Sequence, residues 1–132
     1  MSAKQIRVLI VDDSEICCET AKLMLEEEGL EVFTLSTPIG FSANLQSLRP
    51  DIALVDVAMP AMRGNQLVDI ANRRGAAAVC PVILFSDRKR SELDLLAKSC
   101  GATGVICKSD DWHGIAREIQ GFVRRSGRNV NA

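Results

Sequence analysis

The segment Ile52–Asp56 is the feature that most constrains the fold of this chain, because four apolar residues end abruptly on a carboxylate. Uninterrupted runs of Val, Ile and Leu are typical of a strand that is covered on both faces. Pro60 lacks the backbone N–H that would extend a strand, so the chain is expected to turn there. Asp56 is therefore predicted at the carboxyl end of a buried parallel strand, where open α/β sheets bind their ligands.

Apolar runs alternate with helical patterns along the rest of the chain. The predicted strands are Ile6–Val11, Leu30–Leu35, Asp51–Val55, Pro81–Phe85 and Gly104–Cys107. The predicted helices run from the N-cap Ser14 to about Glu28, from Thr37-Pro38 to just before Pro50, after Gly64, from about Ser91 to Ser99, and from Asp110 or Asp111 onwards. Five strands that alternate with five helices predict βαβ units in a three-layer α/β sandwich.

Two of these helices carry apolar residues at the spacing of one helix face. In the helix after Ser14 these are Ile16, Thr20, Leu23 and Met24. In the last helix they are Trp112, Ile115, Ala116, Ile119, Phe122 and Val123. Both patterns predict helices that pack one face against the sheet.

Composition narrows the class of protein. The 132 residues are 47% hydrophobic and 25% charged, which is typical of one globular domain. A net charge of −1 provides no general attraction to nucleic acid or to an anionic membrane. No apolar run is long enough to span a bilayer, and the N-terminus lacks a secretory pattern, so a soluble cytoplasmic protein is expected. The five cysteines show no zinc or redox spacing and are expected to be reduced core residues.

Polar residues follow four of the predicted strands. Asp12 and Asp13 follow the first, Asp56 the third, Ser86 the fourth and Lys108 the fifth. Carboxylates that meet at one sheet edge repel each other and favour a bound cation, and oxygen ligands suit magnesium. An aspartate in such a site can attack phosphorus, while a lysine and a serine can bind the transferred group.

These residues also resemble a known family. The sequence resembles the receiver domains of two-component response regulators from Ile6 to about Arg124. The matching segments are Val8–Ser14 (VLIVDDS), Pro50–Gly64 (PDIALVDVAMPAMRG), Pro81–Ser86, Gly101-Ala102 and Lys108. The resemblance implies a flavodoxin-like, CheY-like fold with parallel sheet order 2-1-3-4-5. A receiver domain is therefore expected over residues 1–125, and the sequence after it is expected to be a polar tail over 126–132, with no output domain.

The resemblance assigns roles to the residues at the strand ends. Asp56 would be the phosphoacceptor, Lys108 would contact the phosphoryl group, and Ser86 would be the switch hydroxyl. The implied cofactor is Mg2+, held by Asp12, Asp13, Asp56 and the backbone carbonyl of Ala58. The implied partners are a histidine kinase or phosphotransfer protein and a downstream protein target, with no nucleic acid and no membrane. The chain would signal through protein contacts and would not be an enzyme.

Three positions depart from the family pattern. Asp87 stands where a small residue usually follows the switch hydroxyl, Val105 replaces the usual aromatic residue, and Ser109 replaces the proline after Lys108. Without proline a cis bond would cost about 3 kcal/mol, so a trans Lys108–Ser109 bond is expected. Two hypotheses follow: a stand-alone receiver phosphorylated on Asp56, or a pseudo-receiver that binds partners without phosphorylation. A phosphatase is disfavoured because Ala58 offers no second acid after Asp56.

Overall fold

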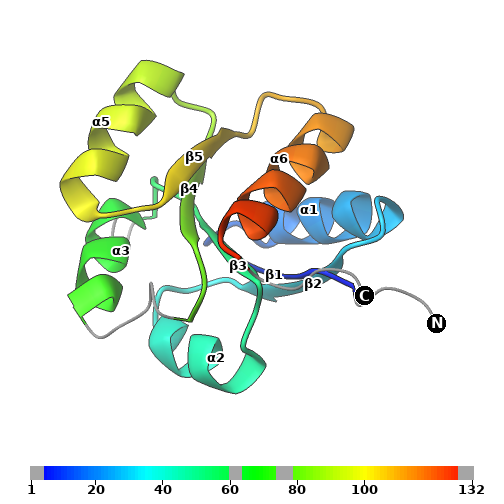
Figure 1. Cartoon of the computed structure of the whole chain (residues 1–132), viewed down its shortest axis with the longest axis horizontal. Helices are drawn as coiled ribbons and strands as arrows, with labels where there is room; N and C mark the ends of the chain where they lie inside the picture. Colours follow the sequence, from blue (N-terminus) through cyan, green and yellow to red (C-terminus); the bar gives the residue numbers. More distant parts are fainter. Residues whose placement is uncertain (1–4, 60–63, 74–78, 128–132) are drawn as a thin grey trace.

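The computed structural model describes residues 5–59, 64–73 and 79–127, which form one parallel sheet with helices on both faces (Figure 1). Its strands are β1 (Arg7–Val11), β2 (Glu31–Leu35), β3 (Ile52–Val55), β4 (Val82–Ser86) and β5 (Gly104–Cys107). Their order is β2-β1-β3-β4-β5, which confirms the expected flavodoxin-like topology. All neighbouring strands pair in parallel, so the carboxyl ends of the strands share one edge of the sheet.

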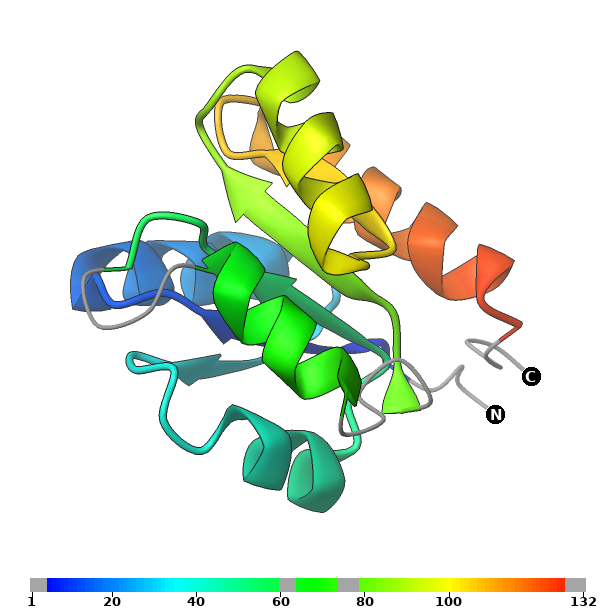
Figure 2. The same ribbon diagram turned by 90° about the vertical axis from the view of Figure 1, so that its left-hand side faces the viewer.

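The helices form two layers. They are α1 (Glu15–Glu27), α2 (Phe41–Leu48), α3 (Gly64–Arg73), α5 (Arg90–Cys100) and α6 (Trp112–Arg125). Helices α1 and α6 cover one face of the sheet, and Figure 2 looks onto the other face, with α2, α3 and α5 in front. Successive strand residues point to opposite faces, so Ile52 and Leu54 join the core beneath α1 and α6. Ala53 and Val55 join the core beneath the other helices.

Two of the predicted helix starts are confirmed and one is wrong. Ser14 caps α1, because its Oγ accepts the Cys17 N–H at 3.2 Å, and Asp111 caps α6 in the same way. Helix α2 begins at Phe41, not at Thr37-Pro38. The Thr37 hydroxyl accepts the Ile39 N–H and closes a turn before the helix. Gly40 then takes φ of 87° at the N-cap, a conformation that glycine adopts without strain.

The apolar pattern of α1 predicted the wrong buried face. Its buried residues are Cys18, Ala21 and Leu25, whereas Ile16 is 76% exposed and Leu23 is 63% exposed. Cys18 and Ala21 are small, so this face lets the helix lie close to the sheet. The pattern of α6 is confirmed, since Ile115, Ala116, Ile119 and Val123 are buried and Trp112 and Phe122 pack against the same core.

Some expectations fall outside the described residues. The turn at Pro60, the side chains of Ile70 and Ala71, and the tail beyond residue 127 are among them. None of the five cysteines forms a disulfide; Cys18, Cys80 and Cys100 are buried as expected, but Cys17 is exposed. Within the described ranges, the helices are too short or too polar to cross a membrane.

Candidate functional site at the carboxyl ends of the strands

Two neighbouring strands bring the three predicted acidic residues together. Asp12 and Asp13 follow β1, Asp56 follows β3, and one carboxylate oxygen of each lies within 4.8 Å of the others. Asp12 is 2% exposed and Asp56 is 6% exposed, whereas Asp13 is open to solvent. The cluster therefore has two buried carboxylates and one exposed carboxylate on its open side.

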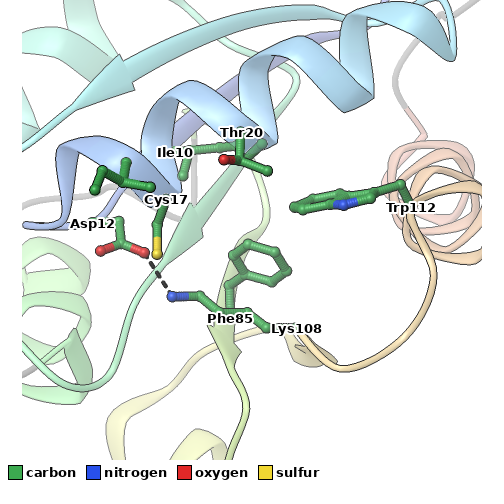
Figure 3. Close-up of a pocket in the computed structure, with 9 residues that line it drawn as sticks. Ile10, Asp12, Cys17, Thr20, Phe85, Lys108 and Trp112 are labelled. Carbon is green, nitrogen blue, oxygen red and sulfur yellow. Dashed lines mark hydrogen bonds and ion pairs between the residues drawn. The ribbon is translucent and has the colours of Figure 1, made fainter.

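Lys108 reaches this cluster from the end of β5. Its Nζ donates to Asp12 Oδ2 at 2.6 Å and lies 3.4 Å from Asp56 Oδ1 (Figure 3 shows the Asp12 contact). The other oxygen of Asp12, Oδ1, accepts the backbone N–H of Ser14 at 2.9 Å. Lys108 was predicted to contact a phosphoryl group, and in this structure it pairs chiefly with Asp12.

The surroundings of Asp56 disfavour its charge. Burial raises the pKa of Asp56, the ammonium of Lys108 opposes that rise, and the nearby Asp12 charge adds to it. A hydrogen bond from the backbone N–H of Ala58 also works to lower the pKa of Asp56, but burial prevails. For Lys108, burial acts to lower the pKa, yet the hydrogen bond to Asp12 and the Asp56 charge outweigh it and raise the pKa. Lys108 is therefore held in its charged form.

Ser86 and Ala58 lie at the same sheet edge. Ser86 ends β4, the strand beside β3, and is buried. Its Oγ accepts the backbone N–H of Arg88 at 3.2 Å, and its carbonyl accepts the Lys108 N–H at 2.8 Å. The bond from Lys108 ties the end of β4 to the end of β5, and the bond from Arg88 closes the turn after β4. Ala58 lies two residues beyond Asp56 and is exposed, and its backbone N–H donates a hydrogen bond to the Asp56 carboxylate.

The residues present fit a magnesium ion. Three carboxylates face one ammonium, which leaves a net formal charge of about −2. A small divalent cation neutralises that charge, and carboxylate oxygens are ligands that magnesium prefers. Asp13 keeps one side of the cluster open to water or to a phosphate oxygen. Asp12, Asp13 and Asp56 are therefore the side chains that would hold the ion.

The three departures from the family pattern are all within the described residues. Asp87 is exposed and forms no ion pair with another described residue. Val105 is buried in the core beneath α5. The peptide bond between Lys108 and Ser109 is trans, as expected.

A hollow lies beside the acidic cluster, and the polar residues that follow the strands did not predict it. Phe85 and Trp112 line it, with ring centroids 6.5 Å apart, together with the exposed thiol of Cys17. One sequence feature could have indicated the hollow: Phe85, an aromatic residue, directly precedes Ser86. The part played by Cys17 depends on which face of α1 is buried, and that face was assigned incorrectly.

Comparison with known proteins gives consistent matches. The response regulator receiver domain model matches residues 8–120. The transcriptional regulatory protein CseB of Streptomyces coelicolor is 31% identical over 125 residues, which cover 95% of this chain and 52% of CseB. A protein-glutamate methylesterase/protein-glutamine glutaminase of Alkalilimnicola ehrlichii is 35% identical over 140 residues, covering 93% of this chain and 33% of that protein. This chain thus spans about half or less of the length of these two relatives.

Solved structures show the same fold. The chemotaxis protein CheY4 of Vibrio cholerae matches with a TM-score of 0.79 and 26% identity, covering 89% of this chain and 98% of CheY4. A CheY-like response regulator receiver domain protein of Methanospirillum hungatei matches with a TM-score of 0.80 at 24% identity, covering 94% of this chain and 98% of that chain.

Proposed function

The chain belongs to the family of response regulator receiver domains, and on that premise we propose that it accepts a phosphoryl group on Asp56. One observation carries the proposal: Asp56 is buried at a strand end, with Lys108 3.4 Å away and two further carboxylates within 4.8 Å. This arrangement supplies a nucleophile, a counter-charge and a set of oxygen ligands at one point. The donor is a histidine kinase or a phosphotransfer protein, and the signal passes to a downstream protein through contacts.

The chemistry is a phosphoryl transfer between two protein side chains. An Asp56 oxygen attacks phosphorus, the bond between phosphorus and the donor histidine nitrogen breaks, and the imidazole leaves with the bonding electron pair. Magnesium, when bound by the three aspartates, neutralises charge on the transferring group. Lys108 then pairs with a phosphoryl oxygen, which requires its Nζ to release Asp12 Oδ2. The Ser86 hydroxyl donates to another phosphoryl oxygen after leaving the Arg88 N–H.

The wider context is part of the same proposal. We propose a stand-alone receiver over residues 1–125 in the cytoplasm, which acts as a signalling module and does not turn over a separate substrate. The two relatives carry sequence beyond the region matched by this chain.

A second candidate is a pseudo-receiver that binds partners without phosphorylation. Asp87 adds an exposed carboxylate directly after Ser86, and Lys108 already pairs with an oxygen that magnesium would use. The Asp87 carboxylate opposes the arrival of an anionic donor, and the Lys108–Asp12 pair opposes the binding of magnesium.

Intact mass spectrometry distinguishes the two candidates. The full chain is incubated with magnesium and acetyl phosphate, and the proposal expects the mass of one phosphoryl group to be added. Asp56→Asn should prevent the addition. Asp51→Asn is the matched control, because Asp51 is a buried aspartate at the opposite end of β3 and should leave the addition intact. An unmodified wild-type chain, with kinase phosphodonors also tested, would favour the pseudo-receiver.

A further inference from the structure

A hollow of about 230 Å³ lies beside the acidic cluster, between α1, the end of β4 and the start of α6 (Figure 3). Its inner walls include the buried side chains of Ile10 and Ala21. The rings of Phe85 and Trp112, tilted by 57°, form another wall, and the exposed side chain of Ile16 forms the rim. The hollow is therefore lined chiefly by aliphatic and aromatic carbon.

Its polar groups gather at the end nearest the acidic cluster. The Lys108 ammonium and the Asp12 carboxylate lie there, paired at 2.6 Å. The Cys17 thiol projects from α1 toward this pair, and the Thr20 hydroxyl lies further along α1, on the side of Trp112 (Figure 3). Thr20 makes no side-chain hydrogen bond with another residue in the described ranges, so its hydroxyl is available to a ligand. An apolar hollow with a few convergent polar groups is the usual form of a small-molecule site.

We propose that this hollow binds a small, mainly apolar molecule about as large as one substituted aromatic ring, with one neutral hydroxyl or carbonyl group. Size supports a compact ligand, because an apolar cavity of about 150 Å³ already accepts benzene. A space this small accommodates one ring and not a helix. Charge supports a neutral polar group, because three carboxylates against one ammonium disfavour an anion. That group would meet Thr20 and Lys108 while the ring packs against the wall formed by Phe85 and Trp112.

Occupancy of the hollow should oppose magnesium binding. The Lys108 side chain forms part of the wall, and its Nζ also lies 5.5 Å from the centroid of the Phe85 ring. A ligand packed against that side chain keeps Nζ on Asp12 Oδ2, an oxygen that a metal ion would otherwise take. The two ligands would then weaken each other by the same factor, as linkage requires. Control of phosphorylation by the ligand rests on the proposed function, whereas binding to the hollow does not.

Titration of the full chain with benzyl alcohol tests the site, followed by backbone amide NMR and by the emission of Trp112, the single tryptophan. We expect shifts confined to α1, the end of β4 and the start of α6, with a dissociation constant on the order of 1 mM. Benzoate, which has the same ring with an anionic group, should bind at least about tenfold more weakly. Saturating magnesium should weaken benzyl alcohol binding by about fivefold or more.

Two variants locate the binding. Trp112→Ala removes a wall and should weaken binding by about fivefold or more in the NMR titration. Leu23→Ala is the matched control, because Leu23 is an exposed apolar residue of α1 that does not line the hollow. If Trp112→Ala fails to fold, the exposed thiol of Cys17 gives a second test. Benzyl methanethiosulfonate forms a disulfide there with loss of methanesulfinate, which fixes a ring in the hollow and should lower magnesium affinity. Cys17→Ser treated in the same way is the control.

Several results would overturn the inference. These are no localised shifts up to about 20 mM benzyl alcohol, equal binding of benzoate, or an affinity that magnesium leaves unchanged. A change in Trp112 emission when the phosphodonor protein is added, together with no binding of benzyl alcohol, would assign the hollow to an apolar side chain of that protein. None of these measurements requires phosphorylation of Asp56. Failure of this inference and failure of the proposed function are therefore distinguishable.

Discussion

Strand β3 carries a buried carboxylate next to each end, and the two differ in what surrounds them. Asp51, 5% exposed, accepts the Arg7 N–H through its Oδ2 at 2.8 Å, and its own N–H donates to the Arg7 carbonyl. Asp56, 6% exposed, faces the ammonium of Lys108 and the carboxylate of Asp12. Burial is the same, so burial alone does not mark a reactive carboxylate. Asp51 is a structural tie to β1, whereas Asp56 lies among charges that can rearrange.

The largest expected effect on the Asp56 end of β3 is a loss of stability in Lys108→Met. This substitution removes the ammonium that neutralises Asp56 and Asp12. Two buried carboxylates are then left without a cation, and we expect stability to fall by about 3 kcal/mol. Magnesium should recover most of the loss, because it takes the place of the ammonium. Urea unfolding with and without magnesium measures both effects. Arg73→Met is the control, because Arg73 pairs with Asp69 at the surface and should change stability by about 1 kcal/mol or less. A Lys108→Met protein as stable as wild type would show that the acidic cluster does not depend on the lysine.

Asp51→Ala should affect stability without affecting phosphorylation. It leaves the Arg7 N–H without its side-chain acceptor, and we expect a cost of about 1–3 kcal/mol. Asp51→Asn retains an acceptor oxygen and should cost less. Thermal unfolding measures the loss, and intact mass after treatment with acetyl phosphate measures the activity. Loss of phosphorylation in a folded Asp51→Ala protein would contradict the division of roles between the two ends of β3.

A smaller effect should appear in the pH dependence of stability. The folded pKa of Asp56 is raised above its ordinary value of 3.8, so the folded state binds the proton more tightly than the unfolded state. The stability of wild type relative to Asp56→Asn should therefore fall as pH rises from 3.8 through the folded pKa. Magnesium binds the ionised carboxylate and should reduce this fall. Urea unfolding of both proteins across this range measures it, and a stability difference independent of pH would refute it.

The smallest predicted effect concerns Asp87, which adds a carboxylate to the Asp56 end of the sheet only. We expect Asp87→Ala to speed phosphorylation by acetyl phosphate about twofold to fivefold at low salt, because the donor is anionic. High salt should remove the difference, since exposed charges are screened beyond about 10 Å. Asp94→Ala is the control, because Asp94 is an exposed aspartate of α5 outside the strand-end cluster. Equal rates for wild type and Asp87→Ala at low salt would show that Asp87 does not influence Asp56.

Much of the fold was predictable because strands that are buried on both faces must be apolar throughout. The runs ending at Val11, Val55 and Cys107 were recognised, and each observed strand boundary lies within one residue of the predicted one. The approach of Asp12, Asp13 and Asp56 was predictable for a related reason. Parallel strands share one carboxyl edge, so residues just beyond their ends must meet there.

The arrangement within the helical layers was less predictable. Helix α1 carries two apolar stripes, and the stripe containing Ile16 and Leu23 is the more hydrophobic of the two. The stripe with Cys18 and Ala21 is the buried one, because small side chains allow close packing on the sheet. The late start of α2 at Phe41 likewise depends on the backbone conformation of Gly40 and on the turn at Thr37.

The sequence by itself determined the order of elements and the residues that reach the strand ends, since periodicity and chain connectivity are local properties. Only the tertiary structure decided which carboxylate Lys108 pairs with, because that choice depends on distances set by three separate strands. It also decided that Phe85, Trp112 and Cys17 enclose a hollow next to the acidic cluster. The walls of that hollow come from segments about 70 to 100 residues apart in the chain, and packing alone brings them together.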